Sequence, residues 1–146
     1  MNIIKKTVQS LVNKYNTNNP FELADFLDIV VIKRTLDKDI KGFYQYFQRN
    51  KIIYINDLLP YNDQKIVCGH ELGHAMLHSK LNIMFLESNT FCIKNKFENE
   101  ANKFAAELLV PDNLLKQYPG FTLEQVASIE YLPLELIKLK FNLSLF

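Results

Sequence analysis

The sequence predicts an α+β fold in which a small antiparallel sheet packs against several helices, with one helix buried at the centre. Three observations support this prediction. Two neighbouring β-rich runs lie between stretches of helical periodicity, and a helix without a polar face follows those runs. A chain of 146 residues is long enough to bury one core but not two, so residues 1–146 are expected to form a single domain.

The first predicted elements are two helices and a strand. Apolar side chains recur at helical spacing over residues 2–15, and four polar residues, 16–19, then break the pattern. Pro20 suits the first turn of a second, short helix over residues 21–27. The β-branched run at residues 28–34 predicts a strand.

A hairpin is expected to complete the sheet, and the second half of the chain is expected to be mainly helical. Two aromatic and β-branched runs, residues 42–47 and 51–56, flank a three-residue connection of hairpin length. Residues 79–95 are predicted to be irregular, with a short extended piece at 91–93. Further helices are predicted over residues 96–109, 112–118, 122–129 and 133–141.

The central helix is predicted over residues 63–78, with Asn62 or Asp63 as its N-cap. Between residues 66 and 77 its strongly polar side chains are His70, Glu71 and His74. Apolar side chains and glycines cover the remaining sides, and a helix that is apolar all round is buried. Gly69 and Gly73 are expected to allow close approach of a neighbouring element.

The polar side chains of this helix form an HExxH motif. His70 and His74 lie one turn apart on one face, so their imidazoles can bind the same metal ion. Glu71 stands beside them as the expected general base. The motif predicts a zinc-dependent peptidase, although such donors also accept manganese or another divalent ion.

A third ligand must come from a carboxylate or a thiolate, because the remaining histidine, His78, lies one turn further and is expected to form hydrogen bonds. Cys68 is expected to be a small buried residue. Glu98 shares the apolar face of the following helix and is the predicted ligand. Glu100 is the alternative, and it shares a lysine-rich face that is expected to be solvated, together with Glu107.

Two blocks of the sequence resemble those of the ImmA/IrrE family of metallopeptidases. Residues 70–78, HELGHAMLH, are similar to its HELGHxxLH block. Residues 98–111, ENEANKFAAELLVP, resemble its second block, ExxANxFAxxLLxP. The hairpin that ends at residues 53–56 fits the segment that precedes the motif helix in this family, so the resemblance covers nearly the whole chain.

The resemblance implies a zincin-like fold with a gluzincin site. In such a site His70, His74 and Glu98 bind zinc, and Glu71 is the catalytic base. Members of the family are typically encoded by phages and mobile elements and cleave a partner helix-turn-helix repressor. The resemblance therefore implies a protein substrate of that kind, and an antirepressor role for the chain.

Several residues remain open as supporting groups. Asn102, one turn after Glu98, is expected to orient a ligand by a hydrogen bond. A peptidase also needs a donor for the oxyanion. The candidates are His78, Tyr44, Tyr46, Tyr54 and Tyr61. The tyrosines are equally consistent with simple packing of the sheet.

Two other functions are consistent with the residues. The protein could bind its repressor without cutting it. Alternatively, residues 122–128 and 133–138 resemble a helix-turn-helix, in which case the chain would be a DNA-binding regulator. The second of these helices carries only Lys138 and Lys140 against Glu135, which is little charge for phosphate contacts.

Composition favours a cytoplasmic protein without a membrane or a direct nucleic-acid partner. The formal net charge is +1, which gives no general attraction to nucleic acid. No apolar run approaches the roughly 18 residues of a membrane span, and the first ten residues lack a signal-peptide core. The two cysteines, Cys68 and Cys92, are too few for a scaffold of bridges, so both are expected to be reduced.

Overall fold

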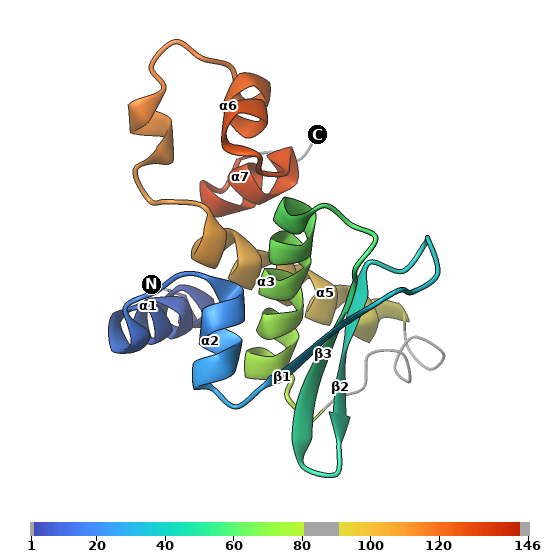
Figure 1. Cartoon of the computed structure of the whole chain (residues 1–146). Helices are drawn as coiled ribbons and strands as arrows, with labels where there is room; N and C mark the ends of the chain where they lie inside the picture. Colours follow the sequence, from blue (N-terminus) through green and yellow to red (C-terminus); the bar gives the residue numbers. More distant parts are fainter. Residues whose placement is uncertain (1, 81–90, 144–146) are drawn as a thin grey trace.

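The computed structural model describes residues 2–80 and 91–143, and for residues 91–95 it describes the backbone only. The fold is α+β, as predicted (Figure 1). The strands are β1 (Val30–Arg34), β2 (Gly42–Phe47) and β3 (Asn50–Asn56). The helical elements are α1 (Ile3–Tyr15), α2 (Pro20–Phe26), α3 (Tyr61–Leu77), α5 (Phe91–Leu109), the 3-10 helix η1 (Leu114–Gln117), α6 (Leu123–Glu130) and α7 (Leu134–Lys140).

The sheet is mixed, and the expectation that it is antiparallel holds only for β2 and β3. Its order is β1-β3-β2, and β1 runs parallel to β3 with Val30 opposite Ile52. A tight turn joins β2 to β3, where Gln48 and Arg49 both have positive φ, the conformation of a two-residue hairpin. The chain between β1 and β2 is longer and crosses to the far edge, so no tight turn forces β1 to be antiparallel.

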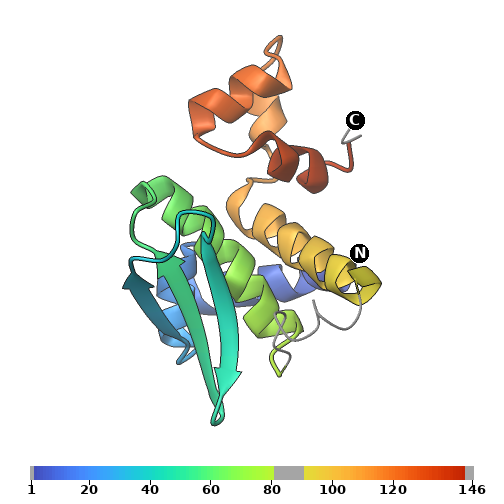
Figure 2. The same ribbon diagram turned by 90° about the vertical axis from the view of Figure 1, so that its right-hand side faces the viewer.

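Helix α3 lies between the sheet and α5, so it is central, as predicted (Figures 1 and 2). Its fully buried Cys68 and Leu72 belong to one core with Ile53 of β3 and Phe104 of α5. A side chain in place of Gly73 would lie 3.0 Å from the Cβ atom of Phe104. The predicted close approach of a neighbour at this glycine is therefore confirmed, and that neighbour is α5.

Two predicted helix boundaries are wrong. Helix α3 begins at Tyr61, and its N-cap residue is Pro60, which has no side-chain acceptor. Asn62 lies inside the helix and donates to the Tyr131 carbonyl 2.7 Å away. Helix α5 begins at Phe91, so the piece predicted as extended is helical. A β-branched and aromatic run does not distinguish a strand from a buried helical turn. Residues 79–80 form a turn, as expected of an irregular stretch, and residues 81–90 lie outside the described residues.

The C-terminal helices form a second core, which packs mainly against the C-terminal part of α5. Helix α6 begins with a capping box between Thr122 and Gln125. Helix α7 is anchored by Lys140, whose ammonium group lies 2.8 Å from Glu107 of α5 and 2.5 Å from Asp112. Among the described residues, none of the helices is both long and apolar enough to span a membrane.

Candidate metal centre

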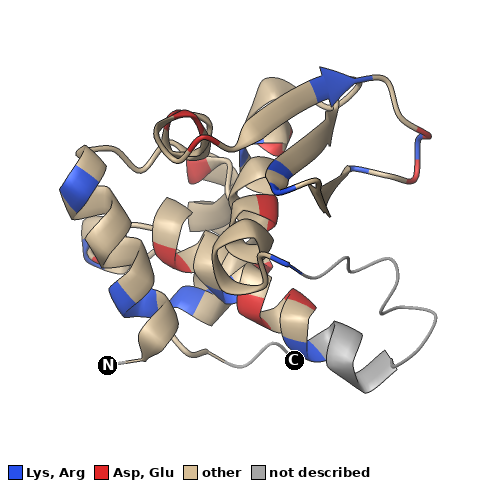
Figure 3. Ribbon diagram, turned by 90° about the horizontal axis from the view of Figure 1, so that it is seen from below, with Lys and Arg blue, Asp and Glu red and all other residues tan. Residues whose placement is uncertain are grey.

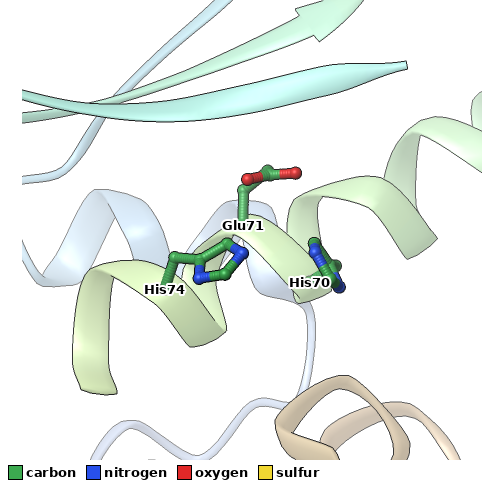
Figure 4. A group of neighbouring side chains, drawn as sticks. All are labelled: His70, Glu71 and His74. Carbon is green, nitrogen blue, oxygen red and sulfur yellow. The ribbon is translucent and has the colours of Figure 1, made fainter. Parts of the chain in front are cut away.

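The motif side chains converge on one side of α3. One ligand atom each from His70, Glu71 and His74 can be chosen so that all three lie within 4.8 Å of one another. Figure 4 shows the two imidazoles on neighbouring turns and Glu71 directed toward the strands. His74 is almost fully buried, at 2% exposure, and Glu71 is also buried. The helix thus holds three polar side chains together in a largely apolar setting.

Helix α5 supplies a second carboxylate to the same place. Each oxygen of Glu98 contacts one of the two imidazoles. Oε2 lies 2.9 Å from His70 Nε2, and Oε1 lies 2.9 Å from His74 Nε2. The close packing of α5 at Gly73 brings Glu98 within this reach. The structure therefore unites the three residues that the sequence predicts as metal ligands.

The two carboxylates of the cluster differ in their surroundings. Burial raises the pKa of Glu98, but hydrogen bonds from His70 and His74 outweigh burial and hold that pKa well below its usual range. Burial raises the pKa of Glu71, and the two histidines offset only part of this increase. Glu98 therefore behaves as a charged partner of the imidazoles, whereas Glu71 is a buried carboxyl group that favours holding a proton.

Asn102 and His78, which were predicted as supporting residues, each form a hydrogen bond with a motif histidine. Asn102 Oδ1 accepts from His70 Nδ1 at 2.8 Å. His78 Nδ1 lies 3.1 Å from His74 Nδ1, and burial lowers the pKa of His78. Each motif histidine thus has its Nδ1 atom engaged and its Nε2 atom turned to Glu98.

The prediction of a solvated face is wrong for Glu107 and holds only in part for Glu100, whose side chain is 33% exposed but contacts a histidine. Glu100 Oε1 lies 3.2 Å from His78 Nε2, and the Glu107 side chain is only 13% exposed beside Lys140. The lysine-rich face does contain the exposed Lys103. A helical wheel shows which side of α5 each side chain is on. It does not show that His78, at the end of α3, and Lys140 of α7 pack against that side.

The tyrosine candidates of the sheet divide between its two faces, whereas Tyr61, the first residue of α3, is 59% exposed. Tyr44 is buried toward α3, and its hydroxyl donates to the Ser79 carbonyl, with burial raising its pKa to about 12. Tyr46 also packs against that core. Tyr54 lies on the opposite face, where its ring stacks on Phe43 with centroids 4.5 Å apart. The structure therefore does not bring Tyr54 to the motif.

A pocket of about 300 Å³ opens at the motif. Its lining includes His70, Glu71 and Asn102, together with Lys41, Ile66 and Val67. The last three residues were not predicted as site residues. Ile66 and Val67 lie one turn before the motif, so helical spacing could have identified them, whereas Lys41 reaches the pocket only through the fold.

The donor set suits a divalent cation. Each Nε2 atom faces a carboxylate oxygen, and Glu71 and Glu98 bring two carboxylates to two imidazoles. Two neutral imidazoles and one carboxylate are a common zinc-binding combination. A cation at the Nε2 atoms would also balance the excess of carboxylates, which the histidines balance only when they are protonated.

Sequence comparison assigns the family. The model of the IrrE N-terminal-like domain, a peptidase family, matches residues 24–136. The chain belongs to the ImmA/IrrE family of metallopeptidases. The matched range contains the sheet, the motif helix and all the residues of the cluster.

Two relatives in this family cover most of the chain. Immunity region protein 2 of Bacillus phage phi105, an uncharacterized protein, is 46% identical over 140 residues, 94% of this chain and 89% of its own length. The metallopeptidase ImmA of Bacillus subtilis is 34% identical over 136 residues, 89% of this chain and 79% of its own length. Membership and the His-Glu-His cluster together support binding of a divalent metal ion.

A solved structure shares the fold. A transcriptional regulator of Mycobacterium tuberculosis superposes with a TM-score of 0.63 at 13% identity. The match covers 98% of this chain but 47% of the regulator, so the ImmA/IrrE chain spans about half the length of that protein.

Proposed function

We propose that the chain is a zinc-dependent endopeptidase that cleaves a partner helix-turn-helix repressor. The observation that carries the proposal is the position of Glu98, whose two oxygens lie 2.9 Å from the Nε2 atoms of His70 and His74. Glu71 lines the adjacent pocket and touches the same cluster. The cluster thus supplies three candidate ligands and a separate base.

In the proposed mechanism His70, His74 and Glu98 would hold zinc, which when bound would supply Lewis acidity. Glu71 takes a proton from the attacking water and returns it to the leaving amine. Its buried position favours this exchange, since a carboxyl group in an apolar setting holds a proton more readily than one in water.

The substrate is proposed to lie as an extended segment beside β2. This strand forms one edge of the sheet in the described part of the chain. Its first residue, Gly42, approaches Val67, which lines the pocket with Glu71. A peptide paired to an exposed strand edge is held by backbone hydrogen bonds, which leaves side-chain recognition to the pocket.

The proposed partner follows from the relatives. One is named as a phage immunity region protein and another as a metallopeptidase. From these two names together we infer that the substrate is a repressor of the immunity region.

The test uses the zinc-loaded protein and a purified helix-turn-helix repressor, sought first among the genes that neighbour its own. We expect the wild type to cut the repressor at one site. Glu71→Gln should retain zinc and reduce the cleavage rate by about 10²- to 10⁴-fold, the usual effect of losing a general base. Cleavage at an unchanged rate by this variant would contradict the proposed mechanism.

Relief of repression by binding alone is the second candidate function, and the same variant tests it. If Glu71→Gln relieves repression as well as the wild type does, cleavage is not required and this alternative is correct. The repressor should then co-elute with the variant and remain intact. Loss of relief in the variant supports the endopeptidase.

The DNA-binding alternative has less support. Lys140, one of the two lysines expected to contact phosphates, is buried against Glu107 and Asp112. Both signs of charge are interspersed along the ribbon seen from below (Figure 3). Phosphate contacts need free cationic side chains, and in the predicted recognition helix only Lys138 remains for that role.

A further inference from the structure

A chain of hydrogen-bonding groups runs from His74 away from the pocket. The His78 ring lies next, with Nδ1 3.1 Å from Nδ1 of His74. On its other side, His78 Nε2 lies 3.2 Å from Oε1 of Glu100. The ring is 6% exposed and packs on Phe97 with centroids 4.4 Å apart. Glu100 and Phe97 come from the same helix, α5, and hold the imidazole from two sides.

Two facing Nδ1 atoms allow only one arrangement of protons if His74 binds a metal. An imidazole that gives its Nε2 lone pair to a metal carries its proton on Nδ1. His74 Nδ1–H must then donate to His78 Nδ1, which must be unprotonated. A neutral His78 therefore carries its proton on Nε2, and Glu100 accepts that proton in a hydrogen bond. A carboxylate is suited to this position, because it only accepts.

We propose that Glu100 is a positioning residue, which selects the Nε2–H tautomer of His78 and thereby keeps His74 Nε2 free to bind the metal. This inference rests on the proposed metal site and deepens it. Glu100 is the last member of the series Glu100–His78–His74, and it acts only through the two rings. It is therefore assigned a role different from that of the ligand Glu98, two residues earlier.

The other motif histidine has a different support. His70 Nδ1 donates directly to Asn102 Oδ1 at 2.8 Å, without an intervening ring. An amide oxygen next to the ligand fixes the tautomer in one step. At His74 the neighbour is an imidazole, which can either donate or accept, so a second group must determine which it does. Glu100 is the described group in contact with the far nitrogen of that imidazole.

The consequence of losing Glu100 follows from these contacts. Without an acceptor at Nε2, His78 can move its proton to Nδ1, where it faces the Nδ1–H of His74. The two N–H groups cannot both remain 3.1 Å apart, so His74 shifts toward the tautomer with the proton on Nε2. That proton competes with the metal. Loss of an outer partner of a metal ligand typically lowers metal affinity by about 10- to 100-fold.

The experiment compares zinc affinity in Glu100→Ala, Glu100→Gln and Asn99→Ala, by competition with a chromophoric chelator. Asn99 is the exposed neighbour of Glu100 on α5 and controls for truncation on the same helix. We expect Glu100→Ala to lose at least about tenfold in affinity. Glu100→Gln should retain most of it, since its amide oxygen still accepts from His78. Asn99→Ala should match the wild type.

A second readout follows the tautomers directly. The chain contains three histidines, so a long-range ¹H–¹⁵N spectrum of the zinc-loaded protein has three imidazole spin systems. His78 should carry its proton on Nε2 in the wild type and in Glu100→Gln, and lose that preference in Glu100→Ala. A purely structural role would lower the melting temperature of the metal-free protein and leave the tautomer of His78 unchanged.

Failure of the inference can be distinguished from failure of the metal site. If the wild type does not bind zinc, the proposed function fails. If the wild type binds zinc and Glu100→Ala binds it equally well with His78 unchanged, the inference alone is overturned. Equal losses in Glu100→Gln and Glu100→Ala would show that an acceptor oxygen at this position is not what maintains zinc affinity, which also overturns the inference.

Discussion

Near the middle of α5, Glu98 lies beside His70 and His74 of α3, and Glu100 lies beside His78, which follows α3. Near the C-terminal end of α5, Glu107 faces Lys140 of α7. At both places carboxylates pack against a neighbouring segment, with the Glu98 and Glu100 side chains 33% exposed and the Glu107 side chain 13% exposed. Lys140 brings its own positive charge, and hydrogen bonds to Asp112 and Glu107 raise its pKa despite burial, which lowers it. The histidines bring no fixed charge, so the first place has an excess of carboxylates.

The difference separates a structural contact from a candidate functional one. A carboxylate paired with a buried ammonium group is satisfied within the fold. A cluster in which carboxylates outnumber fixed positive charges is stable only with protonated histidines or with a bound cation. The α5–α7 contact should therefore depend on its own partners, and the α3–α5 contact on the metal.

The largest effect is expected at the α5–α7 contact. Lys140→Ala removes the ammonium group and leaves the largely buried Glu107 without its partner, which should lower the free energy of unfolding by about 3 kcal/mol. Urea unfolding monitored by circular dichroism measures the change. The double variant Glu107→Gln with Lys140→Met leaves no unpaired charge at that carboxylate and should recover most of the stability. A loss below about 0.5 kcal/mol in Lys140→Ala would mean that the ion pairs do not stabilise the contact.

The second largest expected effect is on zinc-dependent stability, and it distinguishes Glu98 from Glu107. Zinc at 100 times its dissociation constant should stabilise the wild type by about 2.7 kcal/mol, which corresponds to a rise in melting temperature of about 5–10 °C. Glu98→Gln removes a proposed ligand and should lose most of this rise. Glu107→Gln makes the same chemical change near the C-terminal end of α5. This variant should keep the zinc-dependent rise, although its melting temperature without zinc is expected to be lower than that of the wild type.

Thermal unfolding with zinc and with a chelator tests this pair. Glu98→Gln and Glu107→Gln are matched, because each replaces one carboxylate oxygen by an amide nitrogen on the same helix. Equal zinc-dependent shifts in the two variants would remove Glu98 from the site. A lost shift in Glu107→Gln would place the ion elsewhere on α5.

Local patterns predicted most of the candidate site. His70, Glu71 and His74 lie within one helical turn of one another, and their apolar neighbours predict burial of that turn. The helical wheel of α5 predicted that Glu98 lies on the buried face as the third candidate ligand, and the structure brings Glu98 to His70 and His74, although Glu100 also reaches a histidine, His78. These predictions succeed because helical spacing alone determines which side chains share a face.

The features that were missed depend on tertiary contacts. The parallel pairing of β1 depends on where the chain crosses after that strand, which no local pattern encodes. The partners of Glu100 and Glu107 are His78 and Lys140, which lie on other helices, so the wheel of α5 could only predict a solvated face. A buried side of a helix can be predicted from its apolar residues, but a side on which buried ion pairs form cannot.

The smallest expected effect tests the close packing that brings Glu98 to the histidines. An alanine at position 73 would place its Cβ 3.1 Å from backbone atoms of Ala101, which cannot easily move, and the overpacking costs about 1–3 kcal/mol. Greater helix propensity offsets about 1 kcal/mol of that cost. An alanine at position 69 meets only the side-chain end of Leu109 at 3.1 Å, which can shift, so Gly69→Ala should be neutral or slightly stabilising. Zinc titrations should show weaker binding in Gly73→Ala than in Gly69→Ala, because only the first moves α5 away from α3. Equal affinities would show that the site tolerates a change in this spacing.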